Sequence, residues 1–258
     1  MDERTDSAIV QGGRRMFLKL LTAVGVVGGL GLVPQQAAAQ PAPGAAGGPR
    51  PSPGFTYRRL SKDEAAVLLV DHQSGLISLV QDYSPGEFQN NILALADIAK
   101  YYQLPTILTT SFEEGPNGPL VPELKAMFPN APYIPRPGQI NAWDNADFVK
   151  AVKATGRRQL IIAGVVTDVC VAFPTLSALA EGYDVFVVTD ASGTFNTAVR
   201  EAAWTRMANA GAQLMNWFGV ACELHRDWRN DIEGLGTLLS NHIPAYRNLM
   251  TSYAAKKK

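Results

Sequence analysis

One short run of residues restricts the fold of this chain more than any other. The segment 159–163 (Gln-Leu-Ile-Ile-Ala) is apolar on both of its faces, and Gly164 follows it directly. A strand that is buried on both faces is typical of the interior of a parallel sheet, where helices cover both sides. The glycine permits a tight turn at the end of the strand. We therefore expect an α/β fold with a doubly wound, mostly parallel sheet.

Strands and helices alternate along the remainder of the chain. Besides the segment above, strand-like patterns occur at 65–70, 106–110, 133–137, 185–190 and 213–215. Helical periodicity or helix-start signals occur between them, at 88–102, 123–128, 144–156, 170–182 and 198–210. This alternation is what a parallel sheet wound on both sides requires.

Two residues with reactive side chains lie after the ends of predicted strands. Asp71 comes after the first strand, and Cys170 comes at the start of the helix after the strand 159–163. Ligands of doubly wound sheets bind outside the carboxyl ends of the strands, where the winding reverses. In a strand order 3-2-1-4-5 the two strands are neighbours, so Asp71 and Cys170 would meet there. The start of a helix favours thiolate over thiol, so we expect Cys170 to be an activated nucleophile.

Charge and length limit the classes of partner. The 258 residues include 23 basic and 23 acidic side chains, so the formal net charge is zero. Such a balance provides no excess of positive charge with which to bind nucleic acid or an anionic membrane. A small-molecule partner is expected instead.

The first 39 residues have the pattern of an export signal. Arg14 and Arg15 precede Phe-Leu-Lys, a short apolar run at 20–33, and the small residues of 37–39. This arrangement is typical of a cleaved twin-arginine signal peptide and predicts a periplasmic protein without membrane contact after cleavage. The alternative is an uncleaved anchor, which the short, glycine-rich run disfavours. Residues 40–54, rich in Pro, Gly and Ala, are expected to be flexible, and 55–258 to form the functional domain.

Three segments together resemble a known family. They are Val70-Asp71-His72-Gln73, the extended segment around Arg136, and the motif Gly164-Val-Val-Thr-Asp-Val-Cys170. The chain from 55 to 253 is similar to the isochorismatase-like cysteine hydrolases, in particular to their YcaC-type subgroup. The resemblance implies the strand order 3-2-1-4-5-6 and a non-proline cis peptide at Val166–Thr167. It also implies a homo-oligomer, for which an octamer is one form.

The same resemblance assigns roles to individual residues. Asp71 matches the acid/base aspartate and Cys170 the nucleophile, whereas Arg136 occupies the position of the usual lysine. A guanidinium does not give up its proton, so Arg136 would only stabilise negative charge and proton transfer would fall to Asp71. The backbone N–H groups of Val166 and Cys170 are the expected oxyanion-binding donors.

Two aromatic residues and the histidines complete the list of candidates. Phe112 and Trp143 could line the pocket above the strand ends, although core packing is an equal alternative. Metal-using relatives carry Asp-x-His and a further histidine after the second strand, where this chain has the segment 112–115 (Phe-Glu-Glu-Gly). No metal and no cofactor are therefore expected, and His72 is expected to be structural.

The expected activity is hydrolysis of a C–N bond in a small amide through a thioester on Cys170. One alternative is a thiol redox or sensor protein, although no Cys-x-x-Cys motif supports it. A second alternative is a catalytically silent assembly protein with the same fold.

Overall fold

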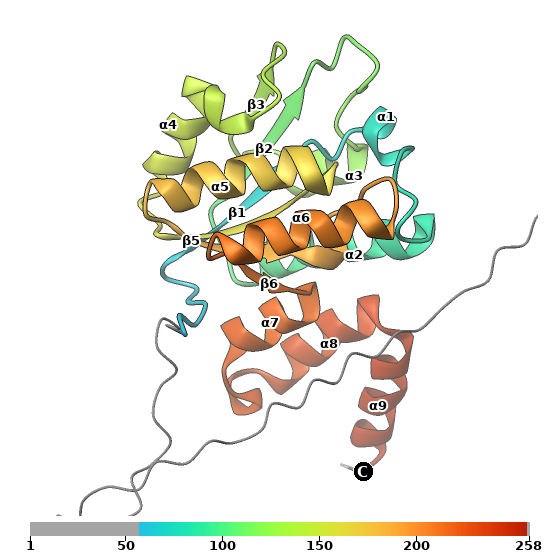
Figure 1. Cartoon of the computed structure of the whole chain (residues 1–258). Coiled ribbons are helices and arrows are strands. Elements are labelled where there is room, and N and C mark those ends of the chain that lie inside the picture. The colour runs from blue at the N-terminus through green and yellow to red at the C-terminus, as the bar shows by residue number, and fades with distance from the viewer. Residues whose placement is uncertain (1–56, 257–258) are drawn as a thin grey trace, which may run out of the picture. The chain divides into compact units, whose positions relative to one another are not determined.

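Six parallel strands form the centre of the fold in a computed structural model that describes residues 57–256 (Figure 1). They are β1 (Ala65–Val70), β2 (Thr106–Ser111), β3 (Tyr133–Arg136), β4 (Gln159–Gly164), β5 (Asp184–Val188) and β6 (Gln213–Met215). Their order is β3-β2-β1-β4-β5-β6, which confirms the predicted order. β1 pairs with β4 over its whole length, from Ala65 opposite Gln159 to Val70 opposite Gly164. The carboxyl ends of these two strands therefore lie side by side.

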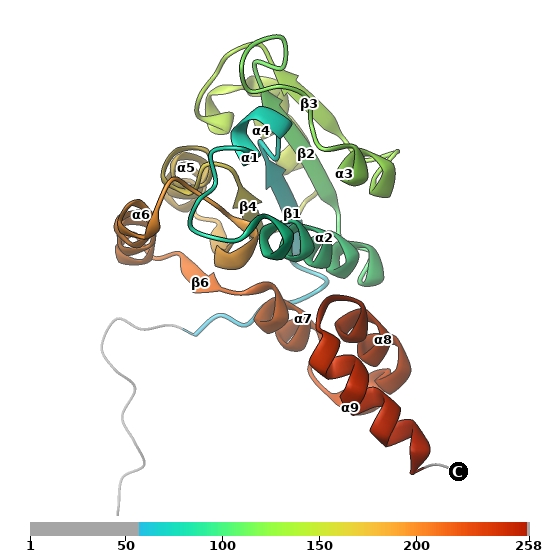
Figure 2. The ribbon, with the colours of Figure 1, turned by 90° about the vertical axis from the view of Figure 1, so that its right-hand side faces the viewer.

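Helices cover both faces of the sheet, as the buried strands require. On one face lie α4 (Ala146–Ala154), α5 (Ala172–Ala180) and α6 (Thr197–Asn209). On the other lie α2 (Pro85–Tyr101) and α7 (Trp217–His225), and α8 (Ile232–His242) packs against α2. Figure 2 shows α5 and α6 on the side of the sheet opposite α2. The smaller helices α1 (Ser74–Ile77) and α3 (Pro122–Met127) belong to the connections around β2.

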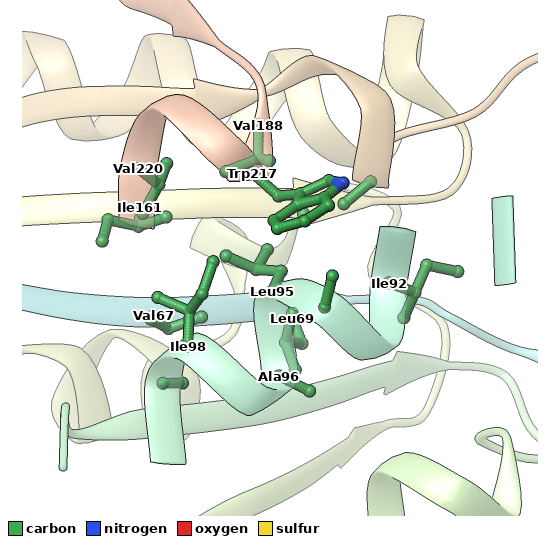
Figure 3. Packing of buried hydrophobic residues seen from close by; sticks show 14 of the residues in the cluster. Val67, Leu69, Ile92, Leu95, Ala96, Ile98, Ile161, Val188, Trp217 and Val220 are labelled. Atoms are coloured by element: carbon green, nitrogen blue, oxygen red, sulfur yellow. The ribbon is translucent and has the colours of Figure 1, made fainter. Parts of the chain in front are cut away.

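The core has two halves because successive strand residues point to opposite faces. In β1, Val67 and Leu69 belong to the cluster under α2, whereas Ala66, Leu68 and Val70 belong to the cluster under α4–α6. Figure 3 shows the first of these clusters, in which β1 and β4 residues pack with Leu95 and Ile98 of α2 and with Trp217 and Val220 of α7. Burial on both sides holds the sheet, and hence the strand ends, in a fixed position.

Asparagine side chains begin three of the helices. Asn145 accepts a hydrogen bond from the Phe148 N–H at 3.0 Å and so marks the start of α4. Asn196 and Asn216 begin α6 and α7 in the same way. The sequence did not predict α8 or the last helix, α9 (Pro244–Ala255), which has no buried residue. Within residues 57–256, no helix is both long enough and apolar enough to cross a membrane.

Candidate active site

The structure brings Asp71, Arg136 and Cys170 together at the carboxyl edge of the sheet. Asp71 follows β1, Arg136 ends β3, and Cys170 lies in the turn after β4. An Arg136 Nη2–H donates to Asp71 Oδ1, and the Cys170 thiol interacts with the same carboxyl group. Asp71 is 0% exposed, Arg136 1% and Cys170 7%. The three predicted catalytic residues thus form one buried cluster, and Cys170 retains some contact with solvent.

The guanidinium of Arg136 is held by four hydrogen bonds. Its Nε–H donates to Thr109 Oγ1 at 3.1 Å, and Nη1 donates to the Gln139 and Ile140 carbonyls at 2.5 and 3.2 Å. The fourth bond is the one to Asp71. Since a guanidinium has five N–H donors, these acceptors fix both its position and its plane. A lysine could not make the Nε contact with Thr109, so the pocket is adapted to arginine.

The backbone turns sharply at Asp71. The Asp71 N–H still donates to the Thr109 carbonyl at 2.9 Å, which continues the strand pairing of β1. The residue itself has a φ of +56°, in the left-handed region that aspartate tolerates better than most residues. The Gln73 N–H then returns to the Asp71 carbonyl at 2.7 Å. This turn ends the strand and places the carboxyl group within reach of Arg136.

The surroundings of the Asp71 carboxyl act on its pKa in opposite directions. Burial raises the pKa of Asp71, and the charge and hydrogen bond of Arg136 lower it. Among residues 57–256, no side chain or backbone group makes a well-directed hydrogen bond to Oδ2. Because Oδ1 is engaged by Arg136, Oδ2 is the oxygen that can accept a proton.

The expected preference of Cys170 for the thiolate is wrong for this structure. Burial and the neighbouring Asp71 carboxyl raise the pKa of the Cys170 thiol well above its usual range. The Val166 N–H and Arg136 act in the opposite direction but are weaker. Cys170 lies in a wide turn over Thr167–Val171, in which the Val171 N–H donates to the Val166 carbonyl at 3.3 Å, before α5 begins at Ala172. Burial beside the Asp71 carboxyl therefore favours the protonated thiol of Cys170.

The cis peptide bond lies one residue earlier than predicted. It joins Val165 to Val166, not Val166 to Thr167. The Val165 N–H still donates to the Val70 carbonyl at 3.1 Å, so sheet pairing extends one residue beyond β4. Thr167 already belongs to the turn that carries Cys170. The chain thus leaves the sheet at the Val165–Val166 bond, a register that the motif alone does not specify.

The predicted oxyanion donors lie on this turn. The Val166 N–H is directed at the Cys170 sulfur, since a hydrogen bond from the Val166 backbone lowers the pKa of the thiol. The involvement of this N–H and of the Cys170 N–H in binding an oxyanion stays a prediction.

Of the two aromatic candidates, only Phe112 is connected to the cluster. Its N–H donates to the Arg136 carbonyl at 2.9 Å, and its side chain is 48% exposed. Trp143 contacts other residues: its ring packs against Phe148 and Tyr183, and its Nε1–H donates to Glu181, at the far end of α5 from Cys170. These contacts give Trp143 a packing role, which was the alternative interpretation.

Two residues that support the cluster were not predicted from the sequence. Thr109 orients Arg136, as described above, and its hydroxyl donates to the Ile134 carbonyl at 2.7 Å. Gln73 is fully buried and joins the ends of β1 and β2: its Nε2 donates to the Ser111 carbonyl at 3.0 Å, and its Oε1 accepts from the Ser111 N–H at 2.8 Å. In the sequence, each of the two is a polar residue within an otherwise apolar strand or a few positions after one. Such a position indicates a hydrogen-bond partner, because a buried polar group requires one.

His72 has a structural position. It is buried, its Nε2–H donates to the Ala191 carbonyl at 3.1 Å, and burial lowers its pKa to about 4. Residues 57–256 contain no group of three His, Cys, Asp or Glu side chains arranged to hold a metal ion. Cys170 and Cys222 are both free cysteines.

The chain is similar to known proteins of one family. Residues 65–217 match the family described as the isochorismatase domain. The probable hydrolase YcaC of Escherichia coli is 78% identical over 197 residues, which cover 76% of this chain and 95% of the relative.

Two solved structures are similar over the same region. One is YcaC from Pseudomonas aeruginosa with hexane-2,5-diol and covalent acrylamide, with 78% identity, a TM-score of 0.76, and coverage of 78% of this chain and 99% of that one. The other is the Escherichia coli YcaC gene product, an octameric hydrolase of unknown specificity. It has 76% identity, a TM-score of 0.77, and coverage of 78% and 98%.

Proposed function

This chain belongs to the isochorismatase family of hydrolases, and we propose that it cleaves the C–N bond of a small amide through a thioester on Cys170. The observation that carries the proposal is the buried cluster in which the Cys170 thiol interacts with the Asp71 carboxyl and Arg136 donates to Oδ1 of the same group. A nucleophile, a proton acceptor and a fixed positive charge are thereby combined in one place.

In the first half of the reaction, the Cys170 sulfur attacks the amide carbon and its proton passes to Asp71 Oδ2. The S–C bond forms, and the carbonyl electrons move onto the oxygen, which the Val166 and Cys170 N–H groups bind. Asp71 then protonates the nitrogen as the C–N bond breaks, so the amine leaves as a neutral molecule. Because Cys170 rests as a thiol, proton removal accompanies the attack instead of preceding it.

In the second half, water releases the acyl group. Asp71, again ionised, takes a proton from the water molecule, and the water oxygen attacks the thioester carbon. The S–C bond breaks, and the proton returns to the sulfur. Arg136 keeps its proton throughout and stabilises the ionised Asp71 at each stage. The sum of the steps is amide plus water giving acid plus amine.

A covalent adduct in a relative supports a reactive nucleophile in this fold. The P. aeruginosa YcaC structure contains covalent acrylamide, which is an electrophile and a small primary amide. The redox-sensor alternative is less well supported, since sensor thiols have lowered pKa values and the pKa of Cys170 is raised.

The test is a panel of small amides assayed with the wild type and two matched variants, Cys170→Ala and Cys222→Ala. We expect Cys170→Ala to lose turnover by at least about 1,000-fold, as for a missing nucleophile, and Cys222→Ala to keep it. Rapid quenching and intact-protein mass spectrometry should show an acyl adduct on Cys170. Full activity in a folded Cys170→Ala protein would refute the proposal, and a sulfenate without any acyl adduct would favour the redox alternative.

We also propose that the protein is exported to the periplasm and assembles as a homo-octamer. The twin-arginine pattern at 1–39 supports export, although these residues and 40–54 lie outside the described part of the chain. The octameric E. coli relative supports the assembly. Replacing Arg14 and Arg15 by lysine should retain the protein in the cytoplasm, and a sedimentation mass other than eight chains would contradict the octamer.

A further inference from the structure

The connections at the carboxyl edge of the sheet have an unusual charge composition. The segments 71–84, 112–121, 137–145, 165–171 and 189–196 contain no lysine and no arginine. They contain seven acidic residues: Asp71, Asp82, Glu113, Glu114, Asp144, Asp168 and Asp190. The histidine in these segments is His72. Its ring is buried, and its lowered pKa keeps the ring neutral, so it adds no positive charge.

The one guanidinium at the centre of this edge is already engaged. Four of the five N–H donors of Arg136 are hydrogen-bonded to protein oxygens, and its charge is paired with Asp71. The next cation along the chain after the last of these segments, Arg200, lies against the Asp82 carboxylate and over the rings of Tyr83 and Trp204. Neither cation is therefore available to neutralise a carboxylate on a substrate.

Large apolar side chains are exposed on the same connections. They are Leu79, Phe112, Ile140 and Phe195, which we call the apolar rim. Backbone hydrogen bonds tie the rim to the site: the Phe112 N–H donates to the Arg136 carbonyl, and the Ile140 carbonyl accepts from Arg136 Nη1.

The remaining two members of the rim connect through Thr194. Phe195 directly follows Thr194, whose hydroxyl donates to Asp168 in the Cys170 turn at 2.7 Å. Leu79 lies two residues before Gln81, whose N–H donates to the Thr194 carbonyl at 2.9 Å. All four residues therefore belong to connections that hydrogen bonds link to Arg136 or to the turn that carries Cys170.

From these observations we propose that the site selects an uncharged small amide with an apolar substituent and rejects amides that carry a carboxylate. The proposal rests on the proposed function and specifies its substrate class. An acidic edge whose cations are already paired repels an anion and raises the cost of bringing it to a buried thiol. An apolar substituent, by contrast, gains by leaving water at the rim.

Two alkylating reagents that differ in charge test this directly. Iodoacetamide is neutral and iodoacetate is anionic. With either one the sulfur–carbon bond forms, iodide leaves, and the thiol proton passes to Asp71 or to water. The labelling rate of Cys170 is measured by mass spectrometry in the full protein carrying Cys222→Ser. Each rate is divided by the rate for the same reagent with the protein unfolded in urea, which removes the intrinsic difference between reagents.

We expect the normalised rate with iodoacetamide to exceed that with iodoacetate by at least about ten-fold. Salt at 0.5 M should reduce the ratio by screening the acidic groups. Ile140 is 62% exposed, so Ile140→Lys should fold and place a cation on the rim. It should lower the ratio at least three-fold, whereas the uncharged control Ile140→Gln should leave the ratio within two-fold of the parent.

The outcomes separate the two proposals. If iodoacetamide does not label Cys170 of the folded wild type at all, a small amide does not reach the thiol and the proposed function fails. If Cys170 is reactive but the ratio is near one, the charge selection fails while the proposed function stands. If Ile140→Lys changes the sedimentation mass and leaves the ratio unchanged, the rim belongs to a subunit contact and the proposed substrate class is overturned.

Discussion

Replacing Thr109 by valine should destabilise the protein far more than the same change at its neighbour, Thr110. Both threonines lie on β2 and are fully buried, but on opposite faces. The Thr109 hydroxyl accepts from Arg136 Nε and donates to the Ile134 carbonyl. Valine keeps the shape of the side chain and removes both bonds, which leaves a charged donor and a carbonyl oxygen buried without partners.

The magnitude follows from these two orphaned groups. A buried polar group without a partner costs about 1–3 kcal/mol, so Thr109→Val should lower the free energy of unfolding by about 3 kcal/mol in total. For a domain of this size that corresponds to a fall in Tm of about 6–12 °C. The Thr110 hydroxyl meets only the Tyr133 hydroxyl, at 3.2 Å, and Tyr133 keeps its bond to Glu113. Thr110→Val should therefore cost at most about 1 kcal/mol, or about 4 °C.

The assay is thermal unfolding of the wild type and both variants at one protein concentration, because assembly affects Tm. Thr109→Ser serves as the rescue variant, since it restores the hydroxyl and should recover most of the loss. Alkylation of Cys170 by acrylamide should also slow in Thr109→Val, because Arg136 loses one of the four hydrogen bonds that fix it beside Asp71. If the two valine variants unfold at temperatures within about 1 °C of each other, the Thr109 hydroxyl does not carry the role assigned to it here.

Two further predictions concern stability. Gly164→Ala should destabilise the protein by at least about 1–3 kcal/mol in urea unfolding, because the new Cβ would lie 2.3 Å from the Val70 carbonyl oxygen; Gly138→Ala, where no atom lies within 4 Å, is the control, and equal urea midpoints would contradict the steric reasoning. Burial lowers the pKa of His72 to about 4, against 6.5 for an exposed histidine, so the unfolded chain binds the extra proton first. This difference in pKa stabilises the folded state fully above pH 6.5. The stabilisation, up to about 3 kcal/mol, is lost as the pH falls towards 4. His72→Gln should lack this component, and an unchanged stability difference between wild type and variant at pH 7 and pH 4.5 would count against it.

The sheet could be predicted because its causes are local. A strand such as 159–163 that is apolar on both faces can be buried only between two layers of helices, and the alternating pattern places a helix after each strand. The family resemblance then supplied the order of the strands. The helices α8 and α9 were missed because they pack outside the strand–helix alternation, and α9 buries no residue that would have produced a strong apolar stripe.

Asp71 and Cys170 could be chosen as candidates from the sequence, since each lies after a strand and the strand order makes those two strands neighbours, whereas Arg136 came from the family resemblance. The protonation state of the site could not be predicted, because it depends on how much water the fold removes. The helix start favours a thiolate at Cys170, yet burial beside the Asp71 carboxyl reverses that preference, and only packed neighbours determine the balance. The hydrogen bond from Arg136 to Thr109 and the position of the cis bond at Val165–Val166 likewise depend on the packed tertiary structure. Residue types and their order along the chain therefore determine which groups reach the carboxyl edge, whereas desolvation and hydrogen-bond geometry, which exist only after folding, decide which of them holds the proton.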